Sequence, residues 1–278
     1  MAEDAEEDLF VPLRPVFGDV LRDRHDRHEL RRERQIADHV TRRGERRRQP
    51  GRRARGLEVA DIVTAAIAVA DEEGPEAVSM RRIARELDVG TMSLYWYVSS
   101  KEELHRLMLE RVQAEALAPE PSGDWRADLR GYAQIMRATL LRHPWAMDFL
   151  GTGPPAGPND ARNAERLMAA LDGLGLDIVL ALQVLTTFGT YVVGAALREI
   201  QEIRWRESMA ATTAGMTEGE IDESLAEFGR RLKESGRYPH LVRILESGVD
   251  PDSPQTRDER FEFGVDCMLD GIAARLQS

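Results

Sequence analysis

Residues 79–101 read SMRRIARELDVGTMSLYWYVSSK, and this stretch decides the fold. It holds two short helical patterns separated by a turn. In the first pattern, apolar side chains share one face at helical spacing, namely Ile83, Ala84 and Leu87. The tripeptide at 88–90, Asp-Val-Gly, breaks the pattern, and we expect Gly90 to take the positive φ angle that a tight corner between helices often needs.

A second short helix is predicted from Thr91 to Val98. Leu94 and Val98 point to its core side, and the other positions form an exposed face, since one short helix cannot bury three aromatic residues in a row. Two such helices favour a helix-turn-helix, whose second helix enters the major groove of DNA. We therefore predict DNA contacts from Arg81, Arg82, Gly90, Thr91, Met92, Ser93, Tyr95, Trp96, Tyr97 and Lys101.

The side chains of the second helix suggest separate roles. The Tyr95 hydroxyl can donate to a phosphate, and Thr91 and Ser93 can reach bases or phosphate. Trp96 either stacks near the sugar-phosphate backbone or braces the helix. Arg81 and Arg82 either read guanine or are ordinary surface residues.

The next helix is predicted to open with a capping box, either Ser99 to Glu102 or Ser100 to Glu103. Lys101 lies at this helix start, where its ammonium group and nearby amides can bind a phosphate.

The run VGTMSLYWYVSSKEEL resembles the N-terminal domain of TetR-type (tetracycline-repressor-like) transcriptional regulators. Leu94, Tyr95 and Lys101 fit the LYxxxxxK pattern of that family, and Trp96 matches the subgroup nearest the tetracycline repressor. The resemblance implies a homodimeric repressor that binds a palindromic double-stranded DNA operator and responds to a small-molecule effector. It also implies that the long helix and the last helix of each subunit form a four-helix bundle.

A fainter resemblance covers the C-terminal part, through LLRHPWAMDFLGTGP and GAALREIQE. In the tetracycline-repressor subgroup this domain holds the antibiotic as a metal chelate. The places of the chelating side chains are taken here by Leu117, Gly131 or Tyr132, Phe149 or Leu150, and Arg198. The resemblance therefore implies a largely apolar effector, with no metal and no cofactor.

Helical periodicity continues through the rest of the chain, and no period-2 strand pattern appears, so we predict an all-α protein. Three domains are expected: a flexible extension over 1–56, acidic and then arginine-rich; a three-helix helix-turn-helix domain over 57–117; and a larger helical ligand-binding and dimerisation domain over 118–278. Helices are predicted at 57–73, 101–117, 125–142, 160–173, 176–206, 218–234, 239–247 and 258–276, with caps at Asp124 and Thr217 and an irregular loop over 151–158.

The formal net charge of −11 conceals an uneven distribution. Residues 22–56 contain fourteen arginines and six acidic residues, whereas residues 57–117 contain twelve acidic and six basic residues. The arginine-rich segment is either a basic arm that lies along phosphates or in the minor groove, or a solvated tail.

Composition also bounds the location of the protein. The start, MAEDAEEDLF, lacks the apolar segment of a secretory signal, and Cys267 is the single cysteine. Residues 176–197 are apolar enough to suggest a membrane span, but they carry polar residues and fit a buried bundle helix better. We expect a cytoplasmic protein without a membrane segment.

A ligand pocket is predicted between the helices at 125–150 and 176–206, lined by Met136, His143, Trp145, Phe149, Phe188, Tyr191 and Arg198. Each aromatic or apolar residue of this set either contacts the ligand or packs in the hydrophobic core. His143 either contacts the ligand or bonds to free backbone carbonyls at the end of its helix. Arg198 follows a long stretch without a basic residue, and either clamps a ligand carboxylate or pairs with a surface glutamate.

No pattern of catalytic or metal-binding residues occurs. The six histidines have no zinc-type spacing, and neither a GxSxG elbow nor a phosphate-binding loop is present. The sequence therefore predicts neither an enzyme nor a metal protein. Two alternatives to a repressor stay open: a helical ligand carrier or interaction protein with a vestigial helix-turn-helix, and a membrane-anchored protein spanning at 176–197.

Overall fold

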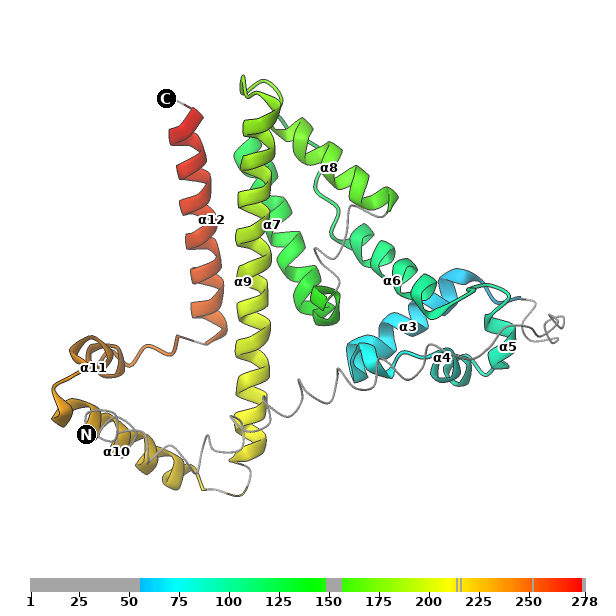
Figure 1. The fold of residues 1–278 in the computed structure, drawn as a ribbon. Helices are drawn as coiled ribbons and strands as arrows, with labels where there is room; N and C mark the ends of the chain where they lie inside the picture. Colours follow the sequence, from blue (N-terminus) through cyan, green and yellow to red (C-terminus); the bar gives the residue numbers. More distant parts are fainter. Residues whose placement is uncertain (1–55, 149–156, 214, 216, 252, 277–278) are drawn as a thin grey trace, which may run out of the picture. The chain divides into compact units, whose positions relative to one another are not determined.

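The computed structural model describes residues 56–276 apart from 149–156, 214, 216 and 252 (Figure 1). The predicted extension over 1–56 lies almost wholly outside the described residues. Phe149 and most of the predicted loop over 151–158 lie outside them as well. Every described element is a helix, as the periodicity predicted.

The described chain forms two compact units. The larger comprises residues 56–200 and 258–276, and the smaller comprises residues 201–257. The helices α3 (Val59–Glu73), α4 (Met80–Glu86), α5 (Thr91–Leu94) and α6 (Lys101–Glu115), with the 3₁₀ helix η3 (Pro75–Ala77), belong to the larger unit. Because the sequence predicts that they carry the DNA contacts, we call these the DNA-reading helices.

The larger unit continues with α7 (Trp125–Arg142), the 3₁₀ helix η4 (Pro144–Asp148), α8 (Pro158–Ala170), the first part of α9 (Ile178–Thr212) and most of α12 (Pro254–Leu276). We call α7, α8, α9 and α12 the effector helices. The smaller unit contains the end of α9, then α10 (Glu218–Ser235) and α11 (Pro239–Glu246). The predicted boundary between residues 117 and 118 falls inside the larger unit, and the predicted division into domains stays a prediction.

Local capping signals explain where several helices begin. The Asp124 carboxylate accepts hydrogen bonds from the backbone N–H groups of Arg126 (3.1 Å) and Ala127 (3.2 Å) at the start of α7. Thr217 and Glu220 form the predicted capping box at the start of α10. Both caps are therefore confirmed.

Two predictions in the helix-turn-helix are wrong. Gly90 has a φ of −71°, and the positive φ of the corner belongs to Asp88, at 50°. Aspartate tolerates this left-handed conformation better than most residues, so the corner does not need the glycine. The second helix ends at Leu94 rather than Val98, and a turn follows in which the Leu94 carbonyl accepts from the N–H groups of Tyr97 and Val98, both at 2.9 Å.

Helix α9 is long and apolar enough to cross a membrane, judged by length and composition alone. One such helix is weak evidence, because the core helix of a soluble bundle has the same properties. Val184, Phe188 and Val192 on this helix are buried in the hydrophobic core. Of the most apolar window of the helix, 22% is buried within the described chain, so much of its apolar surface is left uncovered.

Helix α12 packs closely along α9 at a glycine (Figure 1). The ring of Tyr191 on α9 stacks on Phe261 of α12, and its hydroxyl donates to the Phe261 carbonyl at 2.9 Å. A Cβ atom at Gly264 would lie within 2.0 Å of the Tyr191 hydroxyl oxygen. The absence of a side chain at Gly264 therefore makes this contact possible.

We predict that Gly264→Ala destabilises the fold, because the new methyl group must displace the Tyr191 ring and break its hydrogen bond. Overpacking of this kind costs about 1–3 kcal/mol. Gly229→Ala in α10 is the matched control, since no atom lies within 4 Å of the added Cβ there. Alanine in a helix interior should stabilise that position by up to about 1 kcal/mol. Denaturant unfolding of both variants checks the difference, and equal stability would show that Gly264 has no packing role.

Candidate nucleic-acid interface and effector site

The corner between α4 and α5 is closed by backbone hydrogen bonds. The N–H of Val89 donates to the Ala84 carbonyl at 2.9 Å, and the N–H of Ser93 donates to the Gly90 carbonyl at 2.8 Å. Ser79 caps α4 by accepting from the Arg82 N–H at 3.2 Å. These bonds fix the direction of α5 relative to α4.

The face of α5 and the turn after it is divided as a DNA-reading helix requires. Leu94 and Val98 are fully buried, whereas Met92 is 60% exposed and Tyr95 is 40% exposed. Four further predicted contact residues are half-buried: Thr91, Ser93, Trp96 and Tyr97. Among the three aromatic residues, Tyr97 packs against the hydrophobic core and Tyr95 is the most exposed.

Lys101 is exposed and is the first residue of α6. Of the two predicted caps, Ser100 forms the bond, accepting from the Glu103 N–H at 3.1 Å. The Glu103 carboxylate in turn accepts from the Ser99 hydroxyl and from the Ser99 N–H at 2.7 Å. These hydrogen bonds lower the pKa of Glu103. Lys101 thus extends from a well-ordered helix start beside the DNA-reading face.

The two arginines of α4 have different surroundings. Arg81 is exposed, but the Arg82 guanidinium binds the carboxylates of Glu86 and Glu73, the latter at 2.7 Å. The hydrogen bonds from Arg82 to Glu86 and then to Glu73 raise the pKa of Arg82. Arg82 therefore ties α4 to the end of α3, and Arg81 is the stronger candidate for a DNA contact.

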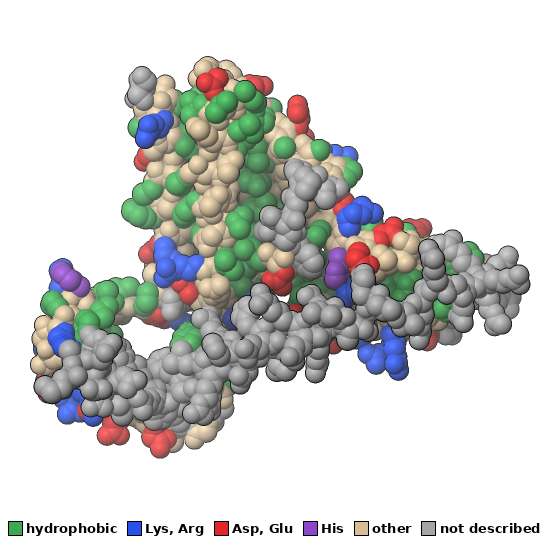
Figure 2. All heavy atoms as spheres, viewed as in Figure 1, with side chains coloured by type: hydrophobic (Ala, Val, Ile, Leu, Met, Phe, Trp, Pro, Cys, Tyr) green, Lys and Arg blue, Asp and Glu red, His purple; other side chains and the backbone are tan. Residues whose placement is uncertain are grey.

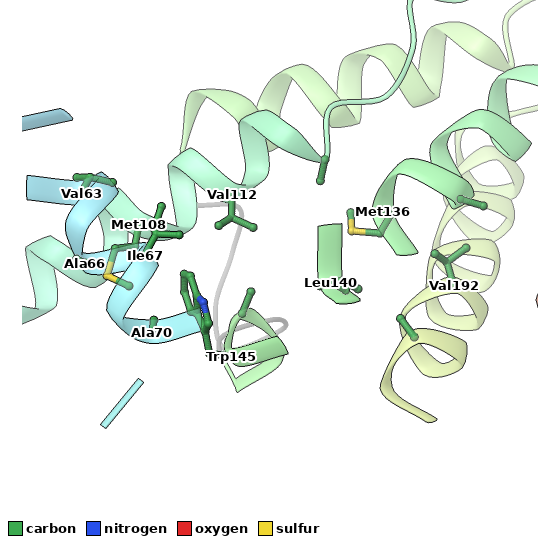
Figure 3. Close-up of a cluster of buried hydrophobic side chains, with 14 of the residues drawn as sticks. Val63, Ala66, Ile67, Ala70, Met108, Val112, Met136, Leu140, Trp145 and Val192 are labelled. Carbon is green, nitrogen blue, oxygen red and sulfur yellow. The ribbon is translucent and has the colours of Figure 1, made fainter. Parts of the chain in front are cut away.

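Most of the predicted pocket residues lie in the hydrophobic core. Phe188 is 1% exposed and Met136 is 7% exposed. Trp145 is 3% exposed, and Figure 3 shows its ring directed from η4 toward Ala70 of α3 and Val112 of α6. Tyr191 is half-buried and contacts α12 as described above.

His143 differs from its predicted alternative, and both alternatives for Arg198 stay predictions. The His143 ring binds two carboxylates, Asp71 at 2.8 Å and Glu115 at 3.2 Å, so the expectation of bonding to backbone carbonyls is wrong. Arg198 is exposed, and its neighbour Glu199 is the buried charge on this part of α9. A ligand role for either residue stays a prediction.

No group of three or more His, Cys, Asp or Glu side chains within the described part of the chain is arranged to hold a metal ion.

Family comparisons agree with this geometry. Residues 62–107 match the family model described as bacterial regulatory proteins, tetR family. Residues 118–276 match the tetracyclin repressor-like C-terminal domain. The chain belongs to the tetR family. It is therefore a DNA-binding transcriptional regulator by family.

Two relatives illustrate the range of similarity. The HTH-type transcriptional repressor DrrR1 of Streptomyces coeruleorubidus is 35% identical over 76% of this chain and 75% of its own length. The class A tetracycline repressor protein from transposon 1721 in Escherichia coli is 27% identical over 77% of this chain and 89% of its own length. The resemblance to the tetracycline-repressor subgroup is thus confirmed across both parts of the chain.

Solved structures with this fold include ActR from Streptomyces coelicolor. The apo form has a TM-score of 0.59 and 28% identity, covering 80% of this chain and 97% of that one. The complex with actinorhodin has a TM-score of 0.56 and 26% identity, covering 79% of this chain and 97% of that one.

The TetR-family fold brings together charged residues that sequence reasoning missed. Arg137 of α7 donates to Glu199 of α9 at 2.8 and 3.0 Å, and also pairs with Asp258 of α12 at 2.6 Å. Both members of the Arg137–Glu199 pair are largely buried. The signal available in the sequence was Glu199, a charged residue inside an apolar helix. Its partner Arg137 lies 62 residues away, so the sequence pattern could not identify the pair.

Helix α8 holds the junction after the DNA-reading helices. The Ala118 N–H donates to the Asn163 side chain at 2.6 Å, and the Ala118 carbonyl accepts from Arg166 at 2.6 Å. Asn159 donates through its side chain to the Glu110 carbonyl at 3.1 Å and through its N–H to the Glu110 carboxylate at 3.0 Å. These bonds tie α8 to α6 and to the segment that follows it.

We predict that Lys101→Ala weakens binding to all DNA sequences alike, because an ammonium group on a phosphate carries no sequence information. The slope of log affinity against log salt concentration should become shallower by about one. Lys233→Ala is the matched control, since it removes the only other lysine, which is exposed on α10 and pairs with Glu246. Fluorescence anisotropy over a salt series measures both slopes. An unchanged slope for folded Lys101→Ala protein would exclude the phosphate contact.

Proposed function

We propose that this chain is a homodimeric repressor that leaves its operator when a small, largely apolar ligand binds the effector helices. The observation that carries the proposal is the α4–α5 corner, where buried Leu94 and Val98 support an exposed face that includes Tyr95. This corner lies within the residues that match the tetR family model. The predicted contact residues on that face are the proposed DNA-binding site. DrrR1, a relative, is named as a repressor.

Exposed apolar side chains on two effector helices support dimerisation. On α9, Ile178 and Val179 are each 61% exposed and Leu182 is 53% exposed; on α12, Phe263 is 70% exposed. Figure 2 shows hydrophobic atoms reaching the surface over this part of the molecule. Gly189 and Gly194 of α9 have open space at the Cβ position, which leaves room for a close helix from a second copy.

Operator binding by such a dimer requires a fixed distance between its two copies of α5. Two copies of α5 must lie about 34–36 Å apart to enter successive major grooves on one face of DNA. A ligand changes operator affinity only if it binds one arrangement of the two DNA-reading parts better than another. A coupling free energy of about 1–3 kcal/mol changes the affinity by about 5–150-fold.

The ligand site is proposed between α7 and α9. Two ActR structures, at 27% and 26% identity, are complexes with (S)-DNPA and with actinorhodin. In this chain Met136, Phe188 and Val192 supply an apolar interior to the region. Arg198 is exposed in the single chain, so an anchoring role requires that a ligand or a second copy cover it.

A regulator of this kind acts on DNA in the cytoplasm without a membrane segment and without catalysis. The alternative, a ligand carrier with a vestigial helix-turn-helix, differs in one observable property. A carrier binds ligand but does not prefer any DNA sequence. Footprinting on the promoter region beside the gene separates the two functions, since a repressor protects an inverted repeat.

We predict that Phe263→Asp converts the dimer to a monomer, because two-fold symmetry buries the added charge twice. Unpaired buried charges cost several kcal/mol, so the dimer dissociation constant should rise at least about a hundredfold. Val59→Asp, an exposed apolar residue on α3, is the control and should leave the dimer intact. Sedimentation equilibrium measures both. A dimeric Phe263→Asp protein would place the interface elsewhere.

We predict that ligand-induced release from the operator does not need a divalent metal. Actinorhodin is the first probe, followed by other planar aromatic compounds, each titrated onto the protein–operator complex with and without EDTA. Release that EDTA abolishes would overturn the metal-free proposal. The same titration with Arg198→Ala tests the anchor: a weaker response supports it, and a normal response removes Arg198 from the site.

A further inference from the structure

His143 joins the DNA-reading helices to the effector helices through both nitrogens of its ring. It follows the last residue of α7 and is 3% exposed. Its Nδ1 lies 2.8 Å from Asp71 Oδ1 on α3, and its Nε2 lies 3.2 Å from Glu115 Oε2 at the end of α6. We call these three residues the His143 joint.

With both carboxylates ionised, the two bonds can form together only if the histidine is a cation. An ionised carboxylate accepts hydrogen bonds and donates none, so each ring nitrogen must carry a proton. Neutral imidazole has one N–H group and can satisfy only one of the two carboxylates. A buried imidazolium between two carboxylates is a charge-assisted arrangement, which is stronger than bonds between neutral groups.

Neighbouring groups hold the two carboxylates in place. The Trp145 Nε1–H of η4 donates to Asp71 Oδ1 at 2.7 Å, and Arg142 donates to Glu115 Oε2 at 2.9 Å. Burial acts to raise the pKa of Glu115, but the hydrogen bonds and charges of His143 and Arg142 outweigh it and lower that pKa. The carboxylate therefore stays ionised and able to accept.

The joint continues into the helix-turn-helix. Asp71 lies in the last turn of α3, two residues before Glu73, which pairs with Arg82 of α4 at 2.7 Å. Thus the same turn of α3 is bound to η4 and α7 on one side and to α4 on the other. A change at His143 alters the support of α4 and of the α5 helix that follows it.

We propose that His143 is a positioning residue for operator binding: as an imidazolium it fixes α3 and α6 against α7, and operator affinity follows its protonation. The proposal rests on the proposed function, since two copies of α5 must be held at a fixed spacing. Helix α8 provides the second attachment, at Glu110 and Ala118, through uncharged amides and Arg166. Among these attachments, the His143 joint is the one in which an imidazole ring lies between two carboxylates.

The direction of the pH effect follows from the carboxylates bound to the ring, Asp71 of α3 and Glu115 of α6, and from Arg142 of α7, which binds Glu115. As pH rises, the imidazolium loses a proton, one hydrogen bond breaks and operator binding weakens. Operator affinity should therefore be highest in the window where both carboxylates are ionised and the imidazole is protonated.

The first experiment measures the protonation of the ring directly. Long-range proton–nitrogen correlation NMR on the full chain reports whether each histidine nitrogen carries a proton, and His143→Gln assigns the signal. We expect both nitrogens of His143 to be protonated at neutral pH. One bare nitrogen in the folded protein would overturn the proposal.

The second experiment measures operator affinity as the pH is raised from neutral. Wild-type affinity should fall about tenfold toward the alkaline end, the effect of losing one charge-assisted hydrogen bond. His143→Gln should bind weakly throughout and show no such fall. His240→Gln, an exposed histidine on α11, is the control and should follow the wild type. A His143→Gln profile parallel to that of the wild type would overturn the proposal.

Two further measurements separate the possible failures. Circular dichroism checks that His143→Gln is folded; if it is not, Glu115→Gln replaces it, since this variant removes one carboxylate and keeps the bond to Asp71. A flattened profile in Glu115→Gln supports the joint, and an unchanged profile overturns it. If wild-type protein binds no operator at any pH, the proposed function fails and the positioning role fails with it, whereas the NMR result still decides whether the imidazolium exists.

Discussion

One hydrophobic core runs from the DNA-reading helices into the effector helices, and Trp145 is where the two parts meet. Its ring leaves η4 and packs among residues of α3 and α6, as Figure 3 shows. Its indole N–H donates to Asp71 of α3. The same side chain therefore joins η4 to α3 through both apolar packing and a hydrogen bond. Because core residues are closely packed, a shift of η4 displaces α3 and α6 rather than being absorbed locally.

Charged side chains set the register of the effector helices around this core. Arg126, Arg130 and Arg137 lie along α7 and pair with acidic residues spaced along α12, namely Asp270, Asp266, Glu262 and Asp258. Ion pairs at the surface add little stability individually. The Arg137–Glu199 pair is different, because removing one partner would leave a largely buried charge, which costs about 3–5 kcal/mol. These pairs therefore specify how α7, α9 and α12 align.

The sequence was sufficient to predict features that depend on local interactions. The extent of α7, its Asp124 cap, the Thr217 box and the burial of Leu94 and Val98 follow from residues close in the chain. The corner was predicted less well, since Asp88 and Gly90 can both supply the positive φ and only the three-dimensional path decides between them. The roles of His143, Trp145 and Tyr191 could not be predicted, because their partners lie roughly 70 residues away. Their residue types made them candidates for a ligand pocket, but did not indicate that they join helices.

The charge of the DNA-reading helices constrains how this regulator recognises DNA. Residues 57–117 contain twice as many acidic as basic residues, and Arg82 already has two carboxylate partners. Few cations remain to attract phosphates, and non-specific binding depends mainly on such attraction. Within the described helices, we therefore expect specificity to come from the proposed contact face around Thr91, Ser93 and Tyr95, which can read bases only when α5 is correctly placed in the groove. Described helices with few free cations attract DNA weakly at long range, so base reading by them depends strongly on the placement of α5. The packing of Trp145 and the bonds to Asp71 that orient α3 therefore bear on operator choice as well as on stability.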